Sequence, residues 1–72
     1  MTIQFAVRGE YIQLDQLLKA TGLCDSGGSA HTAISEGLVM VDGVLETRKR
    51  AKLLAGQKVV FAGETVELTS EA

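Results

Sequence analysis

The sequence predicts an α+β fold in which two short helices pack on a small, mostly antiparallel sheet. Three observations lead to this prediction. An alternation of apolar and polar residues opens the chain, two stretches with helical spacing follow, and the second half contains strand-like runs separated by glycine turns. At 72 residues the chain has room for one domain, which we expect to span residues 1–72.

The first two elements are a strand and a helix. Apolar side chains occupy every second position of residues 3–7, which indicates a half-buried strand that ends at Arg8-Gly9. Leucines and a threonine then recur at helical spacing from Leu14 to Thr21. Gly22 is suited to end this helix, because glycine adopts the left-handed conformation common at helix ends.

The second helix is predicted within DSGGSAHTAISEG, residues 25–37. Asp25 or Ser26 can accept hydrogen bonds from the first free backbone N–H groups, and Gly37 is expected to end the helix. The apolar positions that mark its buried face are Ala30, Ala33, Ile34 and then Leu38.

The remaining residues predict strands and tight turns. Residues 38–46, LVMVDGVLE, indicate a hairpin, because Asp42-Gly43 favours the positive φ angles of a two-residue turn. Further strands are predicted over Lys58–Phe61 and Thr65–Leu68. The chain has no proline, so glycine must supply these turns.

Composition excludes several classes of protein. Phe5 and Tyr11 could in principle stack on bases, but with only three aromatic residues, Phe5, Tyr11 and Phe61, we expect them in an otherwise aliphatic core and expect no stacking platform for single strands. No apolar run is long enough to span a membrane, and the N-terminus does not resemble a secretion signal. One cysteine, Cys24, and one histidine make neither a disulfide nor a closed metal site. We therefore expect a cytoplasmic protein with no membrane partner, metal, cofactor or catalytic residue, in which Cys24 is a small buried side chain.

Positive charge is concentrated in one segment. Residues 48–52 hold four of the seven Lys and Arg residues. The rest of the chain contains the other three Lys and Arg residues and all nine Asp and Glu residues. If residues 48–53 run extended, Arg48, Arg50 and Lys52 share one face at a repeat of roughly 6.6–6.8 Å, and Ala51 and Leu53 anchor the other. Such a row suits phosphate groups. The alternative is a solvated loop that protects the edge of a sheet.

The start of the second helix is the other unusual feature. Gly27 and Gly28 fall in its first turn, where glycine costs ~1 kcal/mol relative to alanine. Close approach of a phosphate to the helix N-terminus would explain both glycines, and the Ser26 hydroxyl could donate to it. The alternative is that the glycines only turn the chain sharply. His31 is expected to be exposed, as a ligand contact or as an ordinary surface histidine.

The order of these parts resembles the alpha-L RNA-binding domain, named after the fourth ribosomal protein of the small subunit. The resemblance covers about residues 14–61. It is carried by the Leu-Asp-x-x-Leu-Leu opening at Leu14, by Ser26, by Ile34-x-x-Gly37, by Val39-x-Val41-Asp42-Gly43 and by the Gly56 turn. The SGG and ETRKRAKL elements are most similar to those of the small stand-alone bacterial proteins of the YbcJ type.

This resemblance implies a bacterial, non-enzymatic protein that binds structured RNA, mainly through phosphates. It is expected to act as a monomer or within a ribonucleoprotein particle. The RNA-facing positions would be Ser26, Gly27, Gly28, His31, Arg48, Lys49, Arg50 and Lys52. Position 31 often holds lysine in such sequences, so His31 removes a permanent charge, and the acidic remainder implies modest affinity. The alternative function is a protein–protein interaction module that uses the same basic face.

Overall fold

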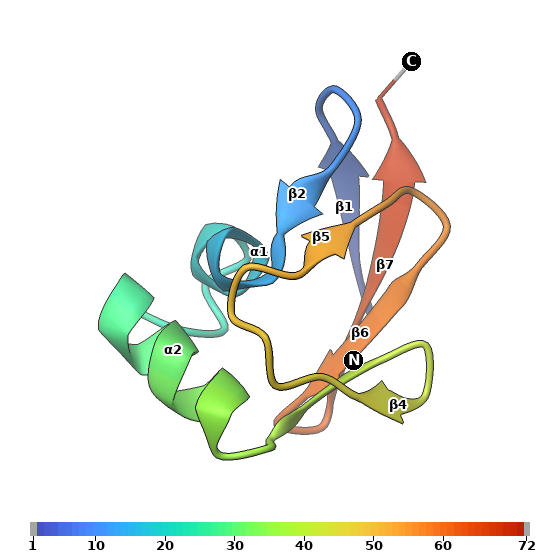
Figure 1. Ribbon diagram of the computed structural model, residues 1–72. Coiled ribbons are helices and arrows are strands. Elements are labelled where there is room, and N and C mark those ends of the chain that lie inside the picture. The colour runs from blue at the N-terminus through green and yellow to red at the C-terminus, as the bar shows by residue number, and fades with distance from the viewer. Residues whose placement is uncertain (1, 72) are drawn as a thin grey trace.

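The structure, a computed structural model, describes residues 2–71 and confirms the α+β prediction. Helix α1 spans Leu14–Ala20 and helix α2 spans Gly27–Ser35. The strands of these residues are β1 (Thr2–Val7), β2 (Ile12–Gln13), β3 (Val39–Val41), β4 (Val44–Leu45), β5 (Lys52–Leu53), β6 (Lys58–Phe61) and β7 (Glu64–Ser70). Figure 1 shows both helices on one side of the sheet. Neither helix is long and apolar enough to cross a membrane.

The main sheet has the order β1-β7-β6-β3-β4, and β2 and β5 form a separate short pair. All pairs are antiparallel except β1 and β7, which run parallel from Thr2↔Thr65 to Val7↔Ser70. The sheet is therefore mostly antiparallel, as predicted. The parallel pair joins the two ends of the chain, so most of the sequence, including both helices, forms the connection between them.

The core lies between the helices and the sheet and is aliphatic, as expected. Its largest fully buried side chains are Leu14, Leu17, Leu18, Ile34, Val39, Leu53, Val59 and Val66. Leu38, predicted to be buried, is instead 55% exposed, because it precedes a strand in which Val39 and Val41 take the inward positions. Tyr11 was also expected in the core and is 40% exposed.

Two tight turns connect neighbouring strands. Asp42 and Gly43 both have positive φ, 51° and 80°, as the predicted β3–β4 hairpin requires. The Asp42 carboxylate accepts hydrogen bonds from the Lys58 backbone N–H at 2.9 Å and from Gln57 Nε2 at 3.1 Å. These bonds hold the pKa of Asp42 below its ordinary value. At the β6–β7 turn, Ala62 and Gly63 also have positive φ, 54° and 79°.

Replacing Ala62 should stabilise the fold. Alanine is disfavoured in the left-handed region, whereas asparagine tolerates it and Asn-Gly is a preferred pair for such a turn. We expect Ala62→Asn to raise the free energy of unfolding by about 0.5–1 kcal/mol, measured by urea denaturation. Ala55→Asn is the matched control, because Ala55 also precedes a turn glycine but lacks positive φ. Equal effects of the two substitutions would contradict the explanation.

Candidate nucleic-acid interface

The basic segment forms a turn at its centre. The backbone N–H of Ala51 donates to the carbonyl of Arg48 at 3.1 Å, which places Lys49 and Arg50 at the tip. The condition that residues 48–53 run extended is therefore not met before β5. The regular spacing of cations that an extended segment would give does not occur. Ala51 and Leu53 are buried as predicted, so the segment is anchored to the core from its C-terminal half.

The turn is fixed to the first turn of α1. The backbone N–H of Leu14 donates to the carbonyl of Ala51 at 2.9 Å, and that of Asp15 donates to the carbonyl of Lys49 at 3.0 Å. The residue before the helix, Gln13, makes no side-chain cap. Because the first N–H groups of a helix lack partners within the helix, the carbonyls of the basic turn act as its cap. The conformation of the basic turn is thus tied to the start of α1.

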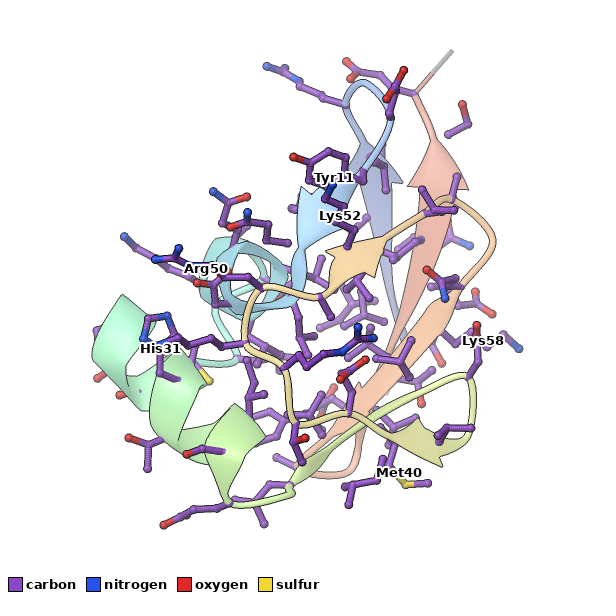
Figure 2. All side chains as sticks on the ribbon, viewed as in Figure 1. Tyr11, His31, Met40, Arg50, Lys52 and Lys58 are labelled. Atoms are coloured by element: carbon purple, nitrogen blue, oxygen red, sulfur yellow. The ribbon has the colours of Figure 1, made fainter. Side chains whose placement is uncertain are left out.

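Asp15 also connects α1 to α2. Its Oδ2 lies 2.9 Å from His31 Nε2, and these two side chains are 14% and 37% exposed. His31 is therefore partly buried and paired, where the sequence predicted an exposed side chain. Through Asp15 the basic turn and α2 lie side by side, and Figure 2 shows Arg50 and His31 on the same side of the molecule. Gly27 is one turn from His31 on the same helix face.

The arginine at the start of the segment is already paired. Arg48 Nε and one terminal nitrogen donate to the two carboxylate oxygens of Glu46, each at 3.1 Å. These bonds lower the pKa of Glu46 and raise that of Arg48, so both groups stay charged and neutralise one another. Arg48 was predicted to be a phosphate contact, and its pairing leaves Lys49, Arg50 and Lys52 as the available cations.

These three side chains are exposed. Within residues 2–71, no side-chain partner is found for Lys49 or Arg50, and Lys52 Nζ lies 5.0 Å from the centre of the Tyr11 ring. Arg48, Arg50, Ala51 and Lys52 line a shallow concavity. Three of these four lining residues are cationic, which suits an anion such as a phosphate.

At the start of α2, Ser26 is the N-cap, as predicted. Its hydroxyl oxygen accepts a hydrogen bond from the backbone N–H of Ser29 at 3.1 Å, and the Ser29 hydroxyl donates to Asp25 at 2.8 Å. An added Cβ would meet nothing within 4 Å at Gly27, and only Ser26 Oγ at 3.8 Å at Gly28. Neither glycine has positive φ. The fold itself therefore does not require glycine at these two positions.

Other reactive groups provide no second site. Cys24 is buried, and burial, followed by the charge of Asp25, raises the pKa of its thiol, which keeps it protonated. Among the described side chains, no group of three or more His, Cys, Asp or Glu residues could hold a metal ion. The structural roles of Asp15, Tyr11 and Glu46 were missed from the sequence. Asp15 and Tyr11 depend on neighbours brought in by the fold, whereas the Glu46–Arg48 pair, two residues apart, depends on the local backbone conformation.

The fold and this surface define a small α+β module that presents three unpaired or weakly engaged cations beside a glycine-containing helix start. The S4 domain family matches residues 5–69 of the chain. The chain belongs to the S4 domain family.

Comparison with known proteins gives closely similar relatives. YbcJ of Escherichia coli (strain K12) is 50% identical over 60 residues, which cover 83% of this chain and 86% of that protein. A solution structure of YbcJ from E. coli, described as revealing an alfa-L motif involved in RNA binding, has a TM-score of 0.67 and 45% identity, and the match covers 96% of this chain and 86% of that one. A tyrosine–tRNA ligase of Ralstonia nicotianae is 38% identical over 61 residues, which are 85% of this chain but 16% of the enzyme.

Proposed function

We propose that this protein binds structured RNA without catalysing a reaction, and that it does so mainly by contacting phosphates. Membership of the S4 family and the likeness to YbcJ support RNA as the ligand. The observation that carries the proposal is the joint placement of the basic turn and α2, which Asp15 holds together through bonds to Lys49 and His31. A bacterial cytoplasm, a monomeric state and a place in a ribonucleoprotein particle remain parts of this proposal.

The proposed contacts differ in strength along the surface. Lys49, Arg50 and Lys52 supply mobile positive charge, and the N-terminus of α2 supplies the free N–H groups of Gly27 and Gly28. Ser26 shapes this end as the cap, and His31 borders it with its position set by Asp15. Arg48 contributes only if RNA displaces Glu46. A-form RNA is read largely through its phosphates, 2′-hydroxyls and shape, which such a surface can contact.

The salt dependence of RNA affinity tests this function. Three phosphate contacts predict a slope of log affinity against log salt of about −2.1 to −2.7, or roughly a 20- to 40-fold loss between 50 and 200 mM salt. The measurement is fluorescence anisotropy with a labelled RNA hairpin at four salt concentrations. A slope near zero, or no binding at the lowest salt, would refute phosphate-based RNA recognition.

Replacing both glycines at the start of α2 by alanine should increase stability but weaken RNA binding. Because space for a Cβ exists at both positions, we expect Gly27→Ala/Gly28→Ala to raise the free energy of unfolding by about 0.5–1 kcal/mol for each substitution. The same change should weaken RNA binding several-fold, since methyl groups would keep a phosphate away from the backbone. Thermal denaturation and anisotropy measure the two effects.

The control for this variant lies in the same helix. Thr32→Ala alters an exposed residue whose hydroxyl bonds the carbonyl of Gly28, and it leaves the first turn open to a ligand. It should not change RNA affinity by more than about twofold. If the glycine variant is more stable and binds RNA as tightly as the unchanged protein, the N-terminus of α2 is not part of the interface.

A further inference from the structure

Tyr11 is the one aromatic side chain of the chain that is exposed to solvent. Phe5 and Phe61 are partly buried and pack against the core, whereas Tyr11 remains 40% exposed. The fold places it immediately before β2, in the residue that follows the Gly9–Glu10 bend. Tyr11 is not among the residues packed against the core, so part of its ring is open to solvent.

The ring of Tyr11 lies next to Lys52, the last cation of the basic segment. In the β2–β5 pair Gln13 is opposite Lys52, and Tyr11 lies immediately before β2. Lys52 Nζ lies 5.0 Å from the centre of the Tyr11 ring. Lys52 also lines the positive concavity together with Arg50. One side chain thus borders both the phosphate-binding concavity and an open aromatic ring.

We propose that Tyr11 is a stacking platform for an unpaired base of the bound RNA, beside the phosphate that Lys52 contacts. This inference rests on the proposed function and adds the class of RNA to it: structured RNA with an unpaired nucleotide at a loop, bulge or end. A nucleotide offers a phosphate and a flat base a short distance apart, which matches a lysine placed over a tyrosine ring. Unpaired bases of RNA are commonly recognised by stacking on aromatic side chains.

Lys52 has two alternative partners in this arrangement. Without RNA its ammonium group lies over the ring, as a cation–π contact. When a phosphate enters the concavity, Lys52 can turn toward it and leave a ring face free for the base. Two favourable contacts then replace one. The stacking contact requires the nucleotide to be unpaired, because a base within a duplex already stacks on its neighbours.

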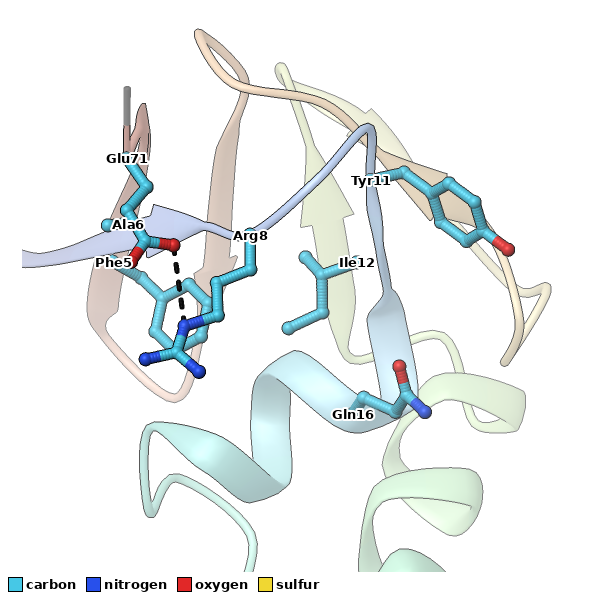
Figure 3. Close-up of a pocket in the computed structure, with 7 residues that line it drawn as sticks. All are labelled: Phe5, Ala6, Arg8, Tyr11, Ile12, Gln16 and Glu71. Atoms are coloured by element: carbon cyan, nitrogen blue, oxygen red, sulfur yellow. Dashed lines mark ion pairs between the residues drawn. The ribbon is translucent and has the colours of Figure 1, made fainter.

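The larger apolar pocket nearby is a different feature. Phe5, Ala6, Arg8, Ile12, Gln16 and Glu71 line it together with Tyr11. Figure 3 shows the Tyr11 ring pointing away from Phe5 and Ile12, and Arg8 engaged with Glu71. Arg8 and Glu71 neutralise one another there, so the pocket offers no net positive charge to the phosphate beside the base. The base is therefore assigned to the open ring and not to this pocket.

Intrinsic fluorescence provides a direct test, because Tyr11 is the only tyrosine and the chain has no tryptophan. A stem-loop RNA with unpaired loop bases should quench the emission, and a blunt duplex of the same stem should quench it much less. Tyr11→Leu should bind the stem-loop about tenfold more weakly and the duplex within about twofold, while Tyr11→Phe keeps the affinity for both. An unchanged salt slope in Tyr11→Leu would show that the cations still bind phosphates.

The outcomes separate this inference from the proposed function. Suppose that the unchanged protein binds both RNAs with the expected salt slope. If Tyr11→Leu then keeps its affinity for the stem-loop, or loses affinity equally for the stem-loop and the duplex, base stacking on Tyr11 is overturned and RNA binding stands. If the unchanged protein binds neither RNA, the proposed function fails and the inference fails with it.

Discussion

Replacing Lys49, Arg50 and Lys52 together by glutamine is expected to abolish most RNA binding. If the three cations each neutralise one phosphate, counterion release predicts a loss on the order of a thousandfold at 50 mM salt, and the remaining affinity should be almost independent of salt. All three side chains are exposed, so the fold should persist. Anisotropy with the RNA hairpin, and circular dichroism to verify folding, measure the effect.

The chain contains its own matched control. Its other cations outside the basic segment are Arg8, Lys19 and Lys58, so the triple replacement of these three by glutamine changes the net charge by the same amount. Arg8 and Lys58 pair with Glu71 and Glu67 and are not part of the basic turn. We expect the control to bind RNA within about threefold of the unchanged protein, because screening weakens charges far from the contact. Equal losses in the two variants would show that net charge, and not the basic turn, governs binding.

The second large effect is expected on stability, from Leu53→Ala. Leu53 is 2% exposed in β5, and its backbone pairs with Ile12 of β2, so it holds the C-terminal side of the basic turn against the core. Removing its side chain should lower the free energy of unfolding by about 2–4 kcal/mol. A domain of this length has a total stability of only about 4–11 kcal/mol. A large part of the population should therefore unfold at temperatures that the unchanged protein tolerates.

The neighbouring leucine is the control for this effect. Leu54 is 53% exposed and carries the same side chain one position further on. We expect Leu54→Ala to change the free energy of unfolding by less than about 0.5 kcal/mol in urea denaturation. If Leu53→Ala is as mild as Leu54→Ala, the buried side chain of Leu53 does not anchor the basic turn to the core.

Local rules predicted most elements of the fold. The N-cap at Ser26, the turn at Asp42-Gly43 and the strand Lys58–Phe61 appear where the sequence indicated them. Each depends on chemistry within a few residues, such as a hydroxyl that caps a helix or a glycine that accepts positive φ. The parallel pairing of β1 with β7 has no such local signal, because it joins strands from opposite ends of the chain.

The sequence predicted the segments that form the candidate site but not the hydrogen bonds that join them. The basic segment and the start of α2 were both identified, yet Asp15, which bonds to His31 and to the carbonyl of Lys49, had no distinguishing mark in the sequence. The segment turns instead of extending because α1 lacks a side-chain cap and takes carbonyls from it. The Glu46–Arg48 pair likewise reduces the available charge through a geometry that composition does not show.

Amide chemical shifts of the labelled protein, followed as an RNA hairpin is added, test the central claim most directly. The account predicts that the amides that move lie at Gly27–His31 and at Arg48–Lys52, which Asp15 brings together. The amides of Met40 and Lys58, which Figure 2 shows away from Arg50 and His31, should stay in place. Shifts confined to the β3–β4 hairpin and β6, with the basic turn and α2 unchanged, would contradict it.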